Sequence, residues 1–141
     1  MSSPELARAR LRVADLPSPP VLVTAEDVVR GKPDPEGYRT VARRLVVPRE
    51  DTVVIEDVPI GIEAARAAGA DAIVGIGRRA LGAGADVVVP DLRPLRWTAD
   101  GLEVGPSSGG GGSVMQSDAE ESPIGVHASA WVPGWSGPEC E

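Results

Sequence analysis

Short apolar runs alternate with stretches of helical periodicity along this 141-residue chain, and this alternation constrains its fold most strongly. The runs at residues 21–24, 53–55, 72–75 and 87–89 are too short for helices and resemble buried strands. A helical stretch over residues 5–14 precedes the first run. Strands that alternate with helices are typical of α/β domains with a parallel sheet. We therefore predict an α/β fold with strands at these four places.

Proline and glycine predict where the later helices begin and end. Pro35 suits the first turn of a helix whose apolar stripe ends at Leu45. Asp57 is expected to cap the next helix, with Pro59 in its first turn. Gly69 is a suitable C-terminal stop for that helix.

The composition changes at residue 105. Residues 107–113 read Ser-Ser-Gly-Gly-Gly-Gly-Ser, and the sequence that follows is acidic and rich in proline and glycine. Such segments bury too little apolar surface to offset the entropy of ordering them. We therefore predict an α/β domain over residues 1–104 and a disordered tail over residues 105–141.

The net charge of −7 is divided unevenly: residues 1–104 carry −2, and residues 105–141 carry −5 with no Lys or Arg. Neither part has the basic stripe that nucleic-acid binding requires. The single Cys140 excludes an intramolecular disulfide. No signal-peptide core follows Met1, and no apolar segment is long enough to cross a membrane. We therefore expect a cytoplasmic protein that binds neither nucleic acid nor membrane.

Three side chains have the chemistry of a phosphoryl-transfer site. Lys32 is the only lysine of the chain and stands in a Gly-Lys-Pro turn, where its ammonium could neutralise a phosphate. Glu56 and Asp57 follow the run at 53–55, at the strand end where open α/β sheets bind ligands. Mg²⁺ takes few carboxylates, several waters and substrate phosphate, which fits this acid pair. The alternative is that Lys32 is a solvated turn residue, Asp57 only caps a helix and Glu56 faces solvent.

A second motif competes with this interpretation. Residues 75–80, Gly-Ile-Gly-Arg-Arg-Ala, match a dinucleotide-binding fingerprint and follow a predicted strand. The helix that should follow contains Gly82 and Gly84, and the strand at 87 begins too soon for a full crossover. No acid ends the following strand, as ribose binding would require. We therefore expect no dinucleotide site.

Three segments together resemble the haloacid dehalogenase-like (HAD) hydrolases. They are residues 23–28 (Val-Thr-Ala-Glu-Asp-Val), residues 31–38 (Gly-Lys-Pro-Asp-Pro-Glu-Gly-Tyr) and residues 54–70, which begin Val-Ile-Glu-Asp-Val-Pro. The chain is similar to the sugar-phosphate and glycerol-phosphate phosphatases of that superfamily over residues 4–104. The resemblance implies that Lys32 contacts the substrate phosphate, that Asp57 binds Mg²⁺ and that Glu56 supports the metal shell. It also implies that the sheet is part of a Rossmann-like HAD core.

The chain departs from the family pattern in what it lacks. The family's nucleophile and general acid/base are two aspartates of an Asp-x-Asp motif on the first strand, and the 141 residues contain no such motif. The family's second motif would fall at or before Met1, and the substrate-selecting cap lies between these two motifs. Val58 stands where a small or hydroxyl residue is commoner. The chain therefore resembles the C-terminal half of such an enzyme, without the first two strands and the cap.

The resemblance thus implies a Mg²⁺-dependent phosphatase of a small phosphorylated metabolite by descent, inactive alone because the nucleophile is absent. The missing strands would leave a gap in the sheet, and exposed strand edges favour association with another polypeptide. We expect the metabolite to bind when an N-terminal half fills that gap. The alternative is a non-catalytic fragment that acts as an interaction partner.

Overall fold

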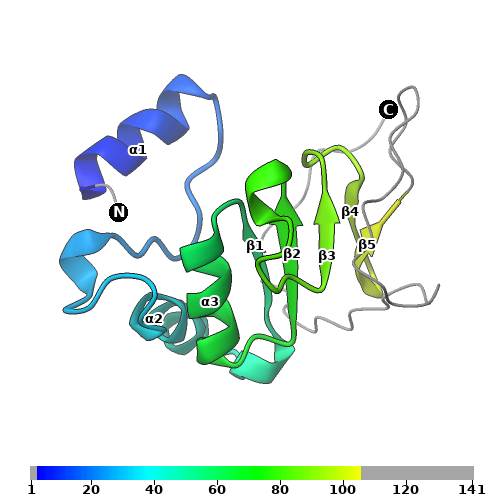
Figure 1. The fold of residues 1–141 in the computed structure, drawn as a ribbon. Helices are drawn as coiled ribbons and strands as arrows, with labels where there is room; N and C mark the ends of the chain where they lie inside the picture. The colour runs from blue at the N-terminus through cyan, green and yellow to red at the C-terminus, as the bar shows by residue number, and fades with distance from the viewer. Residues whose placement is uncertain (1–2, 106–141) are drawn as a thin grey trace.

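Three parallel strands lie at the centre of the computed structural model, which describes residues 3–105 (Figure 1). The predicted tail, apart from Gly105, lies outside the described residues. The elements in chain order are α1 (Pro4–Val13), η1 (Ala25–Asp27), α2 (Glu36–Leu45), η2 (Arg49–Asp51), β1 (Val53–Glu56), α3 (Pro59–Ala68), β2 (Ala72–Ile76), η3 (Arg78–Ala80), β3 (Val87–Val89), β4 (Leu95–Thr98) and β5 (Gly101–Val104), where η marks a 3₁₀ turn.

The sheet has the order β1-β2-β3, and α3 connects its first two strands. Val53 pairs with Ala72, and Val74 pairs with Val87. The predicted α/β fold and the strands at 53–55, 72–75 and 87–89 are therefore confirmed. β1 and β3 form the two edges of this sheet.

Side chains of alternate sheet residues pack on opposite faces, as the two-residue period of strands requires. On one face, Ile62 and Ala65 of α3 pack against Val54 and Ile73. On the other face, Leu102 of β5 packs against Val74 and Val89. Burial of each of these Val, Leu and Ile side chains stabilises the fold by about 1.5–3 kcal/mol.

The segment at residues 21–24 is not a strand, and this prediction was wrong. Thr24 has an extended backbone, with φ −121° and ψ −178°, but no strand lies beside the segment within the described residues, so its backbone has no ladder to join. Other groups bond to its backbone instead: the Arg44 guanidinium donates to the Leu22 carbonyl at 3.4 Å, and the Asp27 amide donates to the Thr24 carbonyl at 3.1 Å. Thr24 is buried, and its hydroxyl donates to Asp27 at 2.9 Å.

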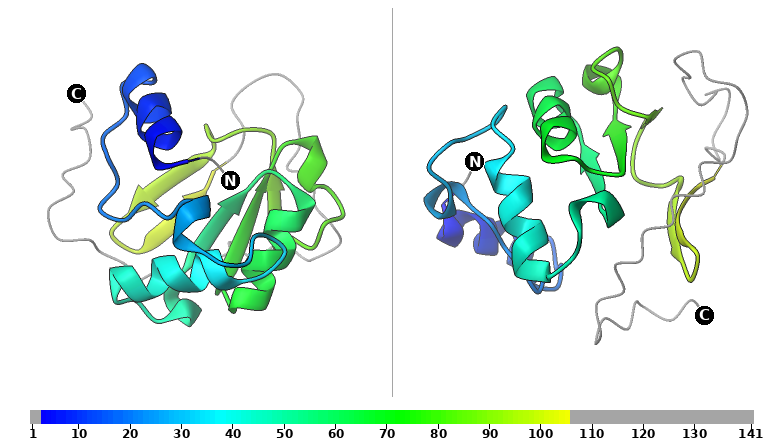
Figure 2. Two further views of the ribbon diagram at one scale, coloured as in Figure 1. Left: turned by 90° about the vertical axis from the view of Figure 1, so that its left-hand side faces the viewer. Right: turned by 90° about the horizontal axis from the view of Figure 1, so that it is seen from below.

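The helices lie close to the predicted positions. α1 stands apart from the sheet and buries none of its residues (Figure 2). α2 and α3 confirm the second and third helices, and Gly69 ends α3 in the left-handed region at φ 83°. The cap of α3 was predicted wrongly: its N-cap is Val58, and no side chain caps it because Asp57 lies one residue too early and is exposed. None of the described helices is long and apolar enough to span a bilayer.

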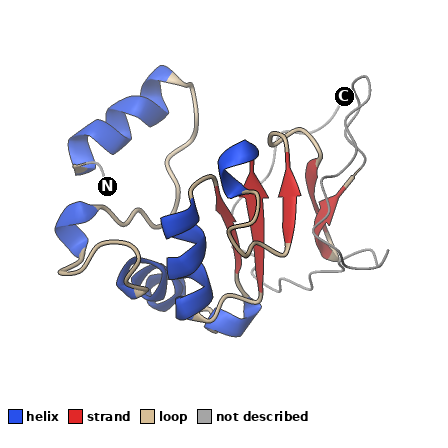
Figure 3. Cartoon of the chain, in the orientation of Figure 1, coloured by secondary structure: helices blue, strands red, loops and turns tan. Residues whose placement is uncertain are grey.

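The hairpin of β4 and β5 was not predicted (Figure 3). Its turn is Ala99-Asp100, and Gly101 follows with a φ of 122°, which favours glycine. The Thr98 hydroxyl closes the turn by donating to the Gly101 carbonyl at 3.1 Å and accepting from the Asp100 amide at 3.2 Å. The hairpin matters because its Leu102 packs in the core on the face of the sheet opposite α3.

Candidate functional site

Lys32 and Glu56 meet at the carboxyl end of β1, although 24 residues separate them in sequence. Lys32 Nζ lies 2.5 Å from Glu56 Oε1, with side-chain exposures of 32% and 9%. Glu56 is the last residue of β1 and shares the α3 side of the sheet with Val54. Lys32 reaches it from the turn that precedes α2. The edge that the sequence marked for ligand binding therefore holds a partly buried ion pair.

Tyr38 of α2 completes the setting of Lys32. The Lys32 ammonium lies 5.2 Å from the centroid of the Tyr38 ring, within the range of a cation–π contact. Burial opposes the charged form of Lys32, but its interactions with Glu56 and Tyr38 outweigh burial and raise its pKa above 10.5. Burial also opposes the charged form of Tyr38, and this raises the pKa of its hydroxyl. Lys32 is therefore a fixed positive charge at neutral pH.

One oxygen of Glu56 remains unsatisfied. Its Oε2 is buried and has no hydrogen-bond partner within the described residues. A buried carboxylate oxygen without a partner is costly, and in a native fold it indicates a place for a donor or a cation. Gly61 of α3 makes room for it, because a Cβ at that position would overlap the Glu56 carboxylate. The glycine therefore allows Glu56 to point inward.

Asp57 lies next to Glu56 but is exposed, and its carboxylate makes no ion pair or hydrogen bond within residues 3–105. No group of three or more potential ligands is placed to hold a metal in the described part of the chain. The structure thus joins Lys32 to Glu56 and leaves Asp57 beside them. The roles of all three in binding phosphate or Mg²⁺ stay predictions.

Two residues of this site were not recognised from the sequence. Tyr38 was counted only as part of the apolar stripe of α2, and nothing local signals its contact with Lys32. Gly61 did carry a signal, because a glycine inside a helical pattern often marks a close approach. Here the approaching group is the Glu56 side chain.

The competing motif at residues 75–80 lacks the helix that a dinucleotide site needs. The only helical element that follows Gly77 within the described residues is the short 3₁₀ turn η3. Packing explains the first glycine, because a Cβ at Gly75 would crowd the side chains of Ala80, Ala85 and Val88. Residues 75–80 therefore do not form the fingerprint's strand–turn–helix, and the expectation of no dinucleotide site stays a prediction.

The fold and this edge define the chain as a Rossmann-like α/β protein with charged groups at the carboxyl end of its first described strand. Residues 1–69 match the haloacid dehalogenase-like hydrolase family. The resemblance to these hydrolases that the sequence motifs predicted is therefore confirmed.

Relatives with known names agree with the resemblance to these hydrolases. The chain is 47% identical over 93 residues to validoxylamine A 7'-phosphate phosphatase of Streptomyces hygroscopicus subsp. limoneus, an alignment that covers 62% of this chain and 40% of that one. It is 47% identical over 68 residues to hexitol phosphatase A of Escherichia coli, covering 48% and 32%. A HAD family hydrolase of Deinococcus radiodurans, solved with bound phosphate and sodium, superimposes with a TM-score of 0.55 at 33% identity, covering 62% and 44%. The chain thus spans less than half the length of each relative.

Proposed function

We propose that this chain carries the phosphate- and cation-binding part of a HAD-like phosphatase for a small phosphorylated sugar or polyol. The observation that carries the proposal is the Lys32–Glu56 pair at the carboxyl end of β1, with the unsatisfied Glu56 oxygen beside it. The substrate class is taken from the relatives, which are named for phosphorylated carbohydrates. The phosphate bound in the Deinococcus hydrolase supports the phosphate-binding part of this proposal.

In this proposal Lys32 binds the phosphate. Its ammonium has three donors, and one contact to Glu56 leaves two for phosphate oxygens. Its side chain is about one-third exposed, so a ligand can reach it from solvent. Glu56 and Tyr38 hold the ammonium in place, which reduces the side-chain entropy lost on binding.

The acid pair fits Mg²⁺ with few protein ligands. Mg²⁺ is commonly held by one or two carboxylates, with waters and substrate phosphate as the other ligands. Asp57 is the exposed carboxylate that would hold the ion, and Glu56 would support its shell through the buried oxygen. When bound, the ion supplies positive charge beside the phosphoryl oxygens.

The chain alone is proposed to be inactive, because its 141 residues contain no Asp-x-Asp nucleophile. An apolar groove beside β1 supports completion by another polypeptide. It has a volume of about 320 Å³ and is lined by side chains of α2, β1 and β4, among them Val41, Leu45, Ile55 and Trp97. The same groove supports the second candidate, a non-catalytic fragment that binds a partner.

Ligand titrations followed by amide NMR test the two binding roles without requiring activity. Inorganic phosphate should shift the amide signals around Gly31 and Lys32 in the native chain and not in Lys32→Gln. Mn²⁺, a paramagnetic substitute for Mg²⁺, should broaden the amide signals around residue 57 in the native chain. The same signals should not broaden in Asp57→Asn. Asp100→Asn, in the distant hairpin turn, is the matched control and should behave as the native chain. Equal responses in all variants would contradict the assigned roles.

A further inference from the structure

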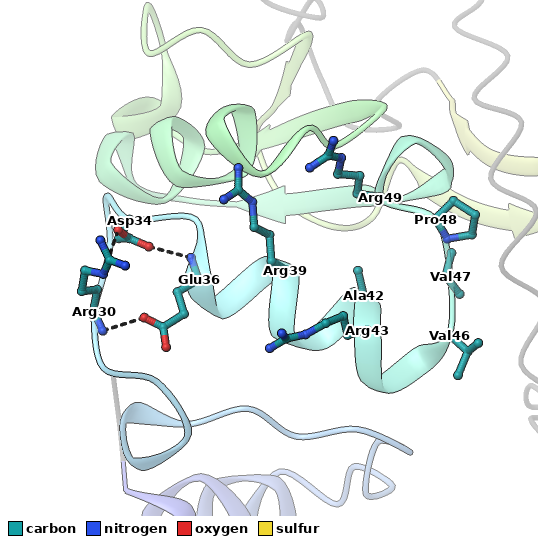
Figure 4. Close-up of a pocket in the computed structure, with 10 residues that line it drawn as sticks. All are labelled: Arg30, Asp34, Glu36, Arg39, Ala42, Arg43, Val46, Val47, Pro48 and Arg49. Atoms are coloured by element: carbon teal, nitrogen blue, oxygen red, sulfur yellow. Dashed lines mark hydrogen bonds and ion pairs between the residues drawn. The ribbon is translucent and has the colours of Figure 1, made fainter.

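A second groove, of about 720 Å³, runs along α2 and the segment that follows it (Figure 4). Neither Lys32, Glu56 nor Asp57 is among the residues that line it. Four arginines line it instead: Arg30, Arg39, Arg43 and Arg49. In a chain with a net charge of −7, this concentration of positive charge on one surface calls for an explanation.

The two acids of this arginine groove are already engaged. Both Glu36 oxygens accept backbone amides, from Val29 and Arg30, at 2.9 Å. Asp34 accepts the Glu36 amide at 2.9 Å and lies 3.6 Å from the Arg30 guanidinium. These carboxylates hold the turn before α2, so they do not neutralise the other three arginines.

Those three arginines keep most of their donors available. Arg39 donates to the Ala67 carbonyl at 3.0 Å, and Arg43 donates to the Thr40 hydroxyl at 3.3 Å. Within residues 3–105, the Arg49 guanidinium makes only a 4.0 Å ionic contact with Glu50, and both side chains are largely exposed. A guanidinium has five N–H donors, so each can still bind a carboxylate in two-point fashion.

The lining between the arginines is apolar. Ala42, Val46, Val47 and Pro48 line the same groove, and Val46 is 88% exposed. A simple inorganic anion would leave this apolar surface in water. The surface therefore fits an extended peptide that carries several carboxylates and at least one apolar side chain.

The chain's own sequence contains such a peptide. We propose that residues 118–124, Asp-Ala-Glu-Glu-Ser-Pro-Ile, dock in the arginine groove of the same molecule. The segment has three acids, no base and a terminal isoleucine, and all 14 Lys and Arg residues of the chain precede residue 105. The thirteen residues from 106 to 118 can span up to about 45 Å. A domain of this size is roughly 34 Å across, so the segment can reach the groove.

Paramagnetic NMR on the full chain tests this docking. A nitroxide on Ser122→Cys, with Cys140→Ser, should broaden the amide signals of residues 39–49 more than those of the rest of the domain. The broadening should fall by at least half in roughly 0.5 M salt, because screening weakens exposed ion pairs. The broadening should also fall in the double variant Arg43→Gln/Arg49→Gln, which removes two of the guanidinium groups that line the groove. The matched control Arg78→Gln/Arg79→Gln removes two exposed arginines of η3 and should leave it unchanged.

Three outcomes would overturn the proposal. Absence of selective broadening at residues 39–49 would mean that the segment does not dock there. Equal broadening in a mixture of nitroxide-labelled, NMR-silent chains with unlabelled ¹⁵N chains would mean that the contact joins two copies. Loss of the broadening in the control variant would mean that overall charge, and not this groove, attracts the segment.

Discussion

At the scale of single residues, the Lys32–Glu56 contact could be predicted only in part. The sequence identified both residues, because one is the only lysine and the other ends an apolar strand. Their 2.5 Å contact also depends on two other residues. Gly61 leaves space for the carboxylate, and Tyr38 lies against the ammonium. A glycine inside a helical pattern signals a close approach but does not say which side chain approaches, so the inward orientation of Glu56 was not expected.

Removal of Lys32 should destabilise the fold. Lys32→Met leaves the Glu56 carboxylate, 9% exposed, without its partner. We expect a loss of about 1–3 kcal/mol in the free energy of unfolding, below the cost for fully buried pairs because Lys32 is partly solvated. Urea denaturation measures it. Lys32→Met/Glu56→Gln should recover part of the loss, and a double variant no more stable than Lys32→Met would contradict a coupled pair.

Gly61 offers a sharper test of the inward Glu56. Alanine is the better helix former by up to about 1 kcal/mol, so Gly61→Ala would ordinarily stabilise α3. Here its Cβ would overlap the carboxylate and force Glu56 away from Lys32. We expect a net destabilisation of about 1 kcal/mol. In a Glu56→Ala background the same change should stabilise, and destabilisation in both backgrounds would show that another contact is responsible.

Asp27 should make stability depend on pH in acid. Hydrogen bonds from the Thr24 amide, the Arg44 guanidinium and the Thr24 hydroxyl lower its pKa from 3.8 to about 2. A lowered folded-state pKa gives stability that is present above 3.8 and is lost as the pH falls toward 2. Asp27→Asn should therefore flatten the fall in unfolding free energy across this window. Arg44→Gln should flatten it less, because the Thr24 amide remains.

Asp91 affects how that measurement is interpreted. The hydrogen bond with the Arg93 guanidinium lowers its pKa to about 2 as well, so Asp27→Asn should keep part of the acid dependence. Asp27→Asn/Asp91→Asn should flatten it further. An unchanged slope in Asp27→Asn would mean that its contacts in the structure do not persist in solution.

At the scale of elements, predictions succeeded where one strand or helix carries its own signal. β1, β2 and β3 are short apolar runs, and α3 ends at a glycine in the left-handed region. The run at 21–24 has the same composition but is not paired, because a strand also needs a neighbour. The β4–β5 hairpin was missed, although Asp100-Gly101 is a typical turn signal.

The hairpin should nonetheless be essential to the core. Leu102 is 6% exposed and packs with Val74 and Val89 on the face of the sheet away from α3. Leu102→Ala should lower the free energy of unfolding by about 2–4 kcal/mol, through lost burial and the cavity left behind. Glu103→Ala, at the exposed neighbouring position, should change it by less than about 0.5 kcal/mol. Similar small effects in both variants would mean that the hairpin does not cover the sheet in solution.

At the scale of the whole molecule, the open edge of β1 is the feature that local patterns could not describe fully. The sequence resemblance predicted a gap beside this strand. The structure has β1 at the edge of its three-stranded sheet, with the apolar groove of Val41, Leu45 and Ile55 alongside. Ile55 is 46% exposed there. Unpaired backbone and apolar side chains at one edge form a surface suited to another strand.

Completion of the sheet should give an activity that we expect the chain alone to lack. We expect no phosphatase activity from the purified chain with Mg²⁺ and sugar phosphates, because its sequence has no Asp-x-Asp. Co-expression with the N-terminal half of hexitol phosphatase A, a relative 47% identical over 68 residues, should give a complex. Apolar burial favours assembly by ~25 cal/mol per Å², and association entropy opposes it by at least about 4 kcal/mol, so affinity should be modest.

The activity of that complex decides the role of the site. Mg²⁺-dependent hydrolysis should appear in the complex and disappear in Lys32→Gln or Asp57→Asn, whereas Asp100→Asn should retain it. Native mass spectrometry establishes that the complex forms in each case, which separates failure to assemble from failure to react. A folded complex that contains the Asp-x-Asp motif but has no activity would contradict Lys32 and Asp57 as working site residues. Turnover by the chain alone that is lost in Lys32→Gln would instead contradict the need for a second polypeptide.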